Sequence, residues 1–101
     1  MFKEITVHDL EKLLQEGAVL VDVRTHGEVA QGMIPDAKHV PLDEILAHAD
    51  SFSKDQPLVL QCKSGGRSAQ ACALLEAKGF KNLYNLAGGI EAWRKAGKPT
   101  T

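Results

Sequence analysis

The sequence has few cysteines, few aromatic residues and no excess of charge of either sign. Only two cysteines occur among 101 residues, and aromatic residues make up 5% of the chain. Cys62 and Cys72 form no Cys-x-x-Cys pair, which excludes a disulfide framework and a cysteine-rich zinc site. Twelve basic and thirteen acidic side chains, mixed along the chain, provide no extended field for nucleic acid or an anionic membrane. Any electropositive site must therefore be local.

Long apolar runs are also absent. No window approaches the roughly 18 apolar residues of a membrane span, and residues 1–14 carry charges throughout and lack the features of a secretory signal. We therefore expect a protein of the reducing cytoplasm with no nucleic-acid or membrane partner. The length fits one domain over residues 1–101, in which the polar tail 97–101 is expected to fray.

Apolar periodicity divides the chain into alternating strands and helices. Thr6 and Asp9 form a capping-box pattern before a helix that stops at Gly17. Short valine- and leucine-rich runs are typical of strands that are covered on both faces. The predicted strands are 18–23, 57–62 and 82–86, with an extended return over 37–42; the other predicted helices are 26–32 (short), 42–52, 67–78 and 90–97. This alternation predicts an α/β fold with a mostly parallel central sheet of about five strands and helices on both faces.

Cys62 lies where the second of these strands ends, at the edge where parallel α/β sheets bind ligands. Two glycines let the next four residues curl, so that backbone N–H groups at the start of the following helix converge on the sulfur. Those N–H groups, Lys63 and Arg67 would all favour a thiolate. The same groups suit a tetrahedral oxyanion. A buried cysteine that is chemically inert is the alternative, and residue chemistry alone leaves both interpretations open.

The spacing of Cys62 and Arg67 adds a further constraint. Cysteine-dependent phosphatases and arsenate reductases separate their cysteine and arginine by five residues, whereas four residues separate them here. This tighter loop, CKSGGRS, resembles the active-site loop of the rhodanese family, whose cargo is a single sulfane sulfur carried as a persulfide.

Two flanking segments carry the same resemblance. Residues 19–42 are similar to the family's upstream signature, with matches at Asp22, Arg24, Glu28, Gly32 and Ile34, and residues 82–99 are similar to its closing signature, with Gly88, Gly89 and Trp93. Two positions depart from the pattern: Met33 stands where the family has histidine, and Asp36 stands where it has glycine. Both lie outside the loop, so they bear on the local turn and the partner surface.

The resemblance implies a single-domain thiosulfate sulfurtransferase that works by double displacement. Cys62 would attack the outer sulfur of a donor such as thiosulfate and then pass that sulfur from its persulfide to a thiol or to cyanide, with no cofactor and no metal. Lys63 and Arg67 would pair with the sulfonate oxygens while the loop amides hold the moving charge. The expected substrate-binding residues are Lys63, Ser64, Gly65, Gly66 and Arg67.

Neighbouring residues receive structural interpretations. Asp22 is expected to organise the loop by accepting backbone donors or holding an arginine, with acid–base work as the alternative. Arg24 and Glu28 are expected to form an ion pair. Ser68 is expected to support the loop by capping the following helix, with donation to the bound anion as the alternative. Cys72 is interpreted as a core residue, with a resolving cysteine as the alternative. Trp93 is interpreted as a core anchor, and the four histidines as solvated or structural.

Three other functions compete with thiosulfate turnover. A persulfide relay module would exchange sulfur with a protein donor or acceptor, in thiolation or cofactor assembly, and would use thiosulfate only incidentally. A phosphatase would hydrolyse aryl phosphates, which the short loop argues against. A noncatalytic regulatory domain of the same fold would commonly lack the cysteine that is present here.

Overall fold

Five parallel strands form one sheet in the computed structural model, which describes residues 1–101. The strands are β1 (Lys3–Ile5), β2 (Val19–Asp22), β3 (Lys38–His39), β4 (Leu58–Gln61) and β5 (Leu83–Leu86), and their order across the sheet is β1-β5-β4-β2-β3. Every neighbouring pair is parallel. The predicted α/β fold is therefore confirmed, although strand β1 was not recognised from the sequence.

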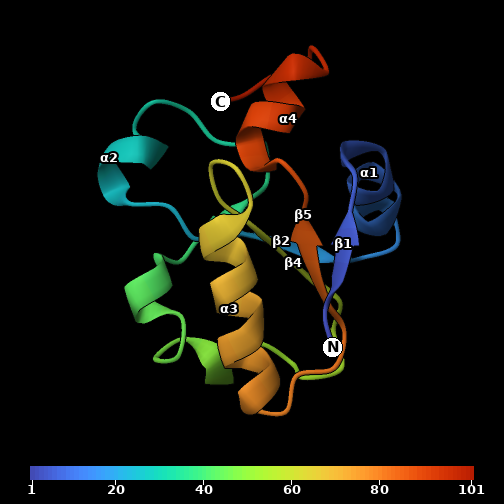
Figure 1. The fold of residues 1–101 in the computed structure, drawn as a ribbon, viewed down its shortest axis with the longest axis vertical. Coiled ribbons are helices and arrows are strands. Elements are labelled where there is room, and N and C mark those ends of the chain that lie inside the picture. Colours follow the sequence, from blue (N-terminus) through green and yellow to red (C-terminus); the bar gives the residue numbers. More distant parts are fainter.

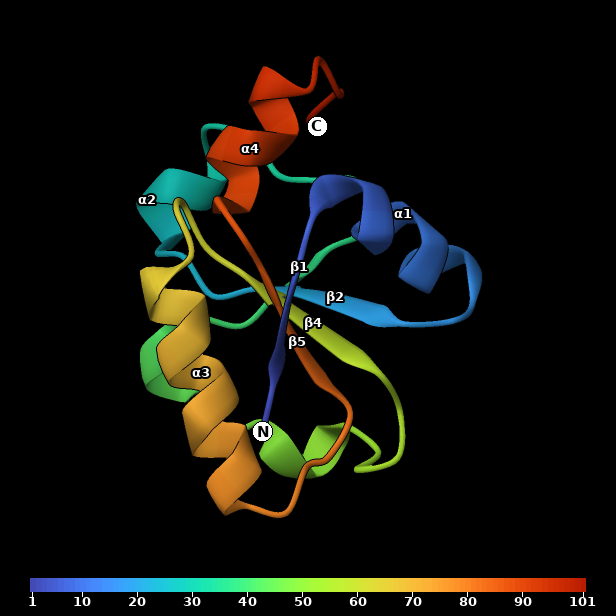
Figure 2. The same cartoon turned by 45° about the vertical axis from the view of Figure 1, so that its right-hand side comes forward.

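Helices cover both faces of the sheet (Figures 1 and 2). The α-helices are α1 (Val7–Gln15), α2 (His26–Val29), α3 (Gly66–Ala77) and α4 (Gly89–Lys95). Helices α1 and α4 pack on one face, and α3 packs on the other together with two short 3₁₀ turns. None of these helices has both the length and the apolar composition needed to cross a lipid bilayer.

The central strand β4 has a continuous apolar run because both of its faces are buried. Leu58 and Leu60 belong to the core cluster beneath α3, whereas Val59 belongs to the cluster beneath α1 and α4. Successive strand side chains point to opposite faces, and both faces of this strand are buried. The two core clusters pack against β4 from both sides, and Cys62 follows directly after its carboxyl end.

The segment 42–52, which periodicity predicts as one amphipathic helix, is not an α-helix. The chain forms 3₁₀ turns at Leu42–Glu44 and Ala49–Ser51. Ile45 is buried as expected, but Leu46 on the same predicted face is 45% exposed. The Ser51 hydroxyl donates a hydrogen bond to the His48 carbonyl, a local bond that competes with a regular helical ladder.

The C-terminal tail, which the sequence predicts to be frayed, is held against the rest of the molecule. The Thr101 amide donates to the Met33 carbonyl at 2.8 Å, and the Trp93 indole donates to the Pro99 carbonyl at 2.8 Å. Lys98 also pairs with Glu11 on α1 at 2.7 Å. The polar tail thus has hydrogen-bond and ion-pair partners that composition does not reveal.

The backbone at Thr6 and at Asp36 follows from the residue types at these positions. The Thr6 capping box is formed by both of its reciprocal hydrogen bonds. Asp36, which stands where the rhodanese pattern has glycine, adopts a left-handed φ of +68° and is the only non-glycine residue that does so. Aspartate tolerates this region better than most residues. The turn therefore keeps the conformation that glycine would provide.

Candidate active site

The loop after β4 lies at the carboxyl edge of the sheet, close to α2 and the start of α4 (Figure 2). Strand β4 pairs with β2 so that Asp22 is the register partner of Gln61, immediately before Cys62. Gly65 ends the loop as the N-cap of α3 with a φ of +115°, a conformation that L side chains rarely adopt. Helix α3 then begins at Gly66.

The Cys62 sulfur is enclosed by hydrogen-bond donors. Only 1% of the residue is exposed. The Gly65 amide donates to Sγ at 3.1 Å, and the Ser68 hydroxyl lies 3.4 Å from it. Burial acts to raise the pKa of the Cys62 thiol, but hydrogen bonds from the Ser68 hydroxyl and from the amides of Ser68, Gly65 and Ser64 outweigh burial and lower the pKa below 9.0. The loop therefore favours a thiolate.

Helix α4 supports this loop from behind. Its amides at Ile90 and Glu91 donate to the carbonyls of Cys62 and Lys63 at 2.9 and 3.2 Å. Gly89 makes this approach possible, because a Cβ there would lie 2.5 Å from the Lys63 carbonyl. The paired glycines belong to the closing signature of the sequence, but the sequence alone does not indicate this contact.

Arg67 is paired with Glu28 through two parallel hydrogen bonds, Nη1 to Oε1 at 2.6 Å and Nη2 to Oε2 at 2.8 Å. The Arg67 guanidinium, helped by the amide and hydroxyl of Thr25, lowers the pKa of Glu28 to about 2 despite partial burial. The predicted Arg24–Glu28 side-chain pair is wrong. The Arg67 guanidinium is also not free to bind a sulfur donor, because two of its N–H groups already bind the Glu28 carboxylate.

Arg24 instead pairs with Asp22, and both side chains are buried, with exposed fractions of 3% and 0%. Two guanidinium nitrogens and the Arg24 amide donate to the Asp22 carboxylate at 2.8 to 3.1 Å. A further Arg24 N–H reaches the Gly32 carbonyl at 2.8 Å, beyond the end of α2. Asp22 does hold an arginine, and this pair fixes the segment that carries Glu28.

Ser68 does not cap α3, since Gly65 takes that position and Ser68 lies inside the first turn. Its hydroxyl is buried against Cys62 Sγ, the Gly65 carbonyl and Asn85 Oδ1. Asn85 on β5 was missed by sequence reasoning. The only signal was an asparagine inside a predicted core strand, where a buried amide needs polar partners.

The second cysteine and the tryptophan are core residues. Cys72 is fully buried in the cluster beneath α3, and burial raises the pKa of its thiol to about 12. Trp93 is 6% exposed and packs in the opposite cluster. Cys72 therefore stays protonated near neutral pH, as expected of a packing residue.

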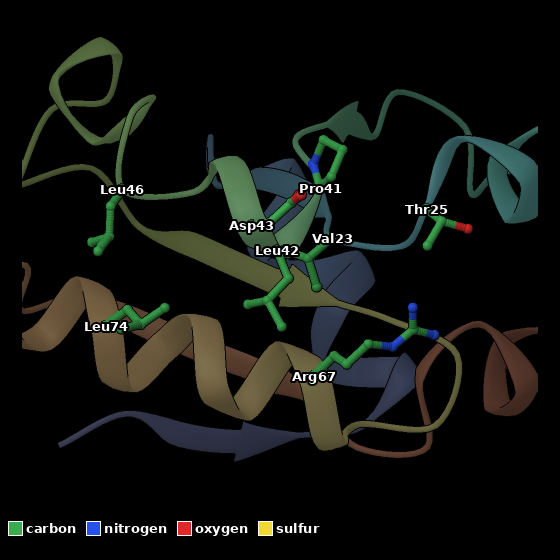
Figure 3. A pocket seen from close by; sticks show the side chains of 8 residues that line it. All are labelled: Val23, Thr25, Pro41, Leu42, Asp43, Leu46, Arg67 and Leu74. Atoms are coloured by element: carbon green, nitrogen blue, oxygen red, sulfur yellow. The ribbon is translucent and has the colours of Figure 1, made fainter.

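An open pocket with a volume of about 500 Å³ borders the loop on the α3 side. Figure 3 shows Arg67 at one end of this pocket and Leu46 and Leu74 at the other. The complete lining is Val23, Thr25, Pro41, Leu42, Asp43, Leu46, Arg67 and Leu74. Cys62 is not part of this lining. The pocket is thus a largely apolar surface beside the sulfur site.

The structure is therefore an α/β protein with a buried cysteine whose sulfur accepts a hydrogen bond from a loop amide. The rhodanese-like domain family matches residues 6–96. The chain is 45% identical over 101 residues to a sulfurtransferase of Allochromatium vinosum, covering 98% of this chain and 94% of that protein. It is 38% identical over 96 residues to the thiosulfate sulfurtransferase GlpE of Ectopseudomonas mendocina, covering 92% and 85%.

A solved structure agrees with these sequence matches. The crystal structure of a rhodanese-related protein from Thermoplasma volcanium superposes with a TM-score of 0.89 at 27% identity, covering 99% of this chain and 98% of that one. The chain belongs to the rhodanese family, whose relatives here are small sulfurtransferases.

Proposed function

We propose that this protein moves one sulfane sulfur from thiosulfate to a thiol or cyanide, with Cys62 as the carrier. The observation that carries the proposal is the position of Sγ, which is 3.1 Å from the Gly65 amide at the base of a loop with four residues between Cys62 and Arg67. The resemblance to thiosulfate sulfurtransferases at 38% identity supports the choice of donor. The activity belongs in a reducing cytoplasm, where Cys62 stays free to react.

The reaction is a double displacement. The Cys62 thiolate attacks the outer sulfur of thiosulfate; a new S–S bond forms, and the donor's own S–S bond breaks so that sulfite leaves with the electron pair. The outer persulfide sulfur then carries the charge, close to the loop amides. An acceptor thiolate attacks that sulfur and regenerates the Cys62 thiolate. No general base is assigned, because hydrogen bonds from the loop amides and the Ser68 hydroxyl lower the pKa of Cys62 and so favour the thiolate.

The groups that we assign to the donor's sulfonate oxygens differ from the prediction in one cation, because Arg67 is no longer among them. Arg67 is occupied by Glu28, and the Gly65 and Ser64 amides already donate to Cys62 Sγ. We therefore assign the sulfonate oxygens chiefly to Lys63, which is exposed at the loop, and to the Gly66 amide. Arg67 keeps its remaining N–H groups available at the rim of the loop. Its main role in this account is to hold the loop against α2.

Steady-state kinetics with thiosulfate and cyanide test this assignment. We expect Cys62→Ser to form no thiocyanate above background. We expect Lys63→Ala to raise KM for thiosulfate about tenfold, which corresponds to about 1.4 kcal/mol of binding, with little change in kcat. Lys12→Ala, which removes an exposed lysine on α1, is the matched control and should keep wild-type values. An unchanged KM in Lys63→Ala would remove Lys63 from the donor site.

The pocket beside the loop favours a second candidate function, a persulfide relay that serves a protein partner. Thiosulfate is small and polar and does not need a largely apolar pocket of about 500 Å³. The exposed side chains of Leu46 and Leu74 suit a larger acceptor. Weak thiosulfate turnover combined with rapid sulfur exchange with a cysteine desulfurase persulfide would favour the relay. Saturation by thiosulfate at millimolar or lower concentration would favour the first function.

A further inference from the structure

The buried hydroxyl of Ser68 faces three acceptors but has one proton to donate. Its Oγ lies 3.4 Å from Cys62 Sγ and 3.3 Å from the Gly65 carbonyl oxygen, and it makes a short contact with Asn85 Oδ1. Ser68 is fully buried and Asn85 is 2% exposed, so bulk water does not reach either side chain. The direction of this single proton affects how well Cys62 holds a negative charge.

The Gly65 carbonyl is not a real competitor for the proton. It already accepts hydrogen bonds from the Ala69 amide at 3.2 Å and from Asn85 Nδ2 at 3.1 Å. A carbonyl oxygen has two lone pairs, and these two donors use both. The choice therefore lies between Cys62 Sγ and Asn85 Oδ1.

The orientation of the Asn85 amide is determined by its other partners. Nδ2 donates to the Gly65 carbonyl and also to both carboxylate oxygens of Glu4, at 3.1 and 3.0 Å. A carbonyl and a carboxylate only accept, so a flipped amide would place oxygen against oxygen. Oδ1 therefore points at Ser68, and Ser68 is the one donor that reaches it.

We propose that the Ser68 hydroxyl is a two-position hydrogen-bond switch and that Asn85 and Glu4 are positioning residues that set its bias. While Cys62 Sγ carries no charge, the hydroxyl donates to Asn85 Oδ1. When Cys62 is a thiolate, the hydroxyl turns to Sγ and leaves Oδ1 without a donor. Asn85 thus opposes the thiolate, and Ser68 stabilises it.

This switch matches the charge movement of sulfur transfer, and in that respect the inference rests on the proposed function. The charge is on Sγ before attack and on the outer sulfur afterwards. As the S–S bond forms, the Ser68 hydroxyl turns back to Asn85, and no proton is exchanged with solvent. Asn85 therefore lowers the free energy of the persulfide relative to the thiolate.

A double-mutant cycle on the pKa of Cys62 tests the switch. The ultraviolet absorbance of the thiolate is titrated in wild type, Ser68→Ala, Asn85→Leu and the double variant, with Cys62→Ser as baseline; Cys72, with its pKa of about 12, stays silent. We expect Ser68→Ala to raise the pKa of Cys62 and Asn85→Leu to lower it by about one, a tenfold increase in thiolate at acidic pH. In the Ser68→Ala background, Asn85→Leu should have no further effect.

Two results would overturn the proposal. One is a rise in the pKa of Cys62 in Asn85→Leu; the other is an equal shift in both backgrounds, which would mean that Asn85 supports the loop without acting through Ser68. If Asn85→Leu does not fold, exposed Glu4→Gln provides the same comparison, with a smaller decrease that disappears in Ser68→Ala. No sulfur donor is present, so this result is independent of whether the protein transfers sulfur.

Discussion

Asp22→Asn is expected to lower the free energy of unfolding by about 3 to 5 kcal/mol, the usual cost of breaking a buried ion pair. The substitution leaves the Arg24 guanidinium, 3% exposed, without a counter-charge. Asparagine can accept only part of the hydrogen bonding that the carboxylate now receives from Arg24. Urea unfolding followed by circular dichroism measures the loss.

The matched control for this prediction is Glu11→Gln. Glu11 also forms an ion pair, with Lys98 at 2.7 Å, but its side chain is 45% exposed. Removing an exposed pair is expected to cost about 1 kcal/mol or less. A double variant, Asp22→Leu with Arg24→Met, removes both buried charges and should recover much of the loss. Equal effects of Asp22→Asn and Glu11→Gln would contradict the importance of burial.

Gly89→Ala is expected to destabilise the protein by about 2 to 5 kcal/mol and to disturb the loop that follows Cys62. The position has a φ of +57°, which costs a residue with a Cβ about 1 to 2 kcal/mol, and overpacking adds about 1 to 3 kcal/mol. The new Cβ would meet the Lys63 carbonyl at 2.5 Å. Helix α4 must then move away from the loop, and its hydrogen bonds to the Cys62 and Lys63 carbonyls weaken. Thermal unfolding and the pKa of Cys62 report the two effects.

Gly66→Ala is the control within the same loop. Apart from its chain neighbours and the backbone of its own helix, no heavy atom lies within 4 Å of a Cβ built at Gly66, and its φ is not in the left-handed region. Alanine keeps the backbone N–H, so we expect stability to be unchanged or to rise by about 0.5 kcal/mol. If Gly66→Ala were as damaging as Gly89→Ala, the steric explanation for Gly89 would be wrong.

Much of the fold could be predicted because local signals agreed with one another. The apolar run of β4, the glycines after Cys62 and the alanine-rich α3 indicate a strand, loop and helix, which the structure contains. The helix predicted for residues 42–52 was wrong, because the same apolar periodicity fits a helix and a series of turns. In a series of turns, only some of the apolar side chains are buried in the core. Leu46 is the residue that distinguishes them.

The site was harder to predict where partners lie far apart in the chain. Glu28 and Arg67 are 39 residues apart, and Glu4 and Asn85 are 81 apart. Arg24 is an instructive case, because helical spacing favoured Glu28 as its partner while Asp22 lay two residues away on a strand. Long-range pairs need the strand order, which places β5 between β1 and β4.

Intact-mass spectrometry can measure whether Cys62 carries one sulfur atom. The reduced protein is incubated with thiosulfate, freed of excess reagent and weighed before and after addition of cyanide. We predict a gain of one sulfur that cyanide removes, that Cys62→Ser prevents and that Cys72→Ala leaves unchanged. A wild-type mass without added sulfur, or a sulfur that Cys62→Ser still retains, would contradict the account.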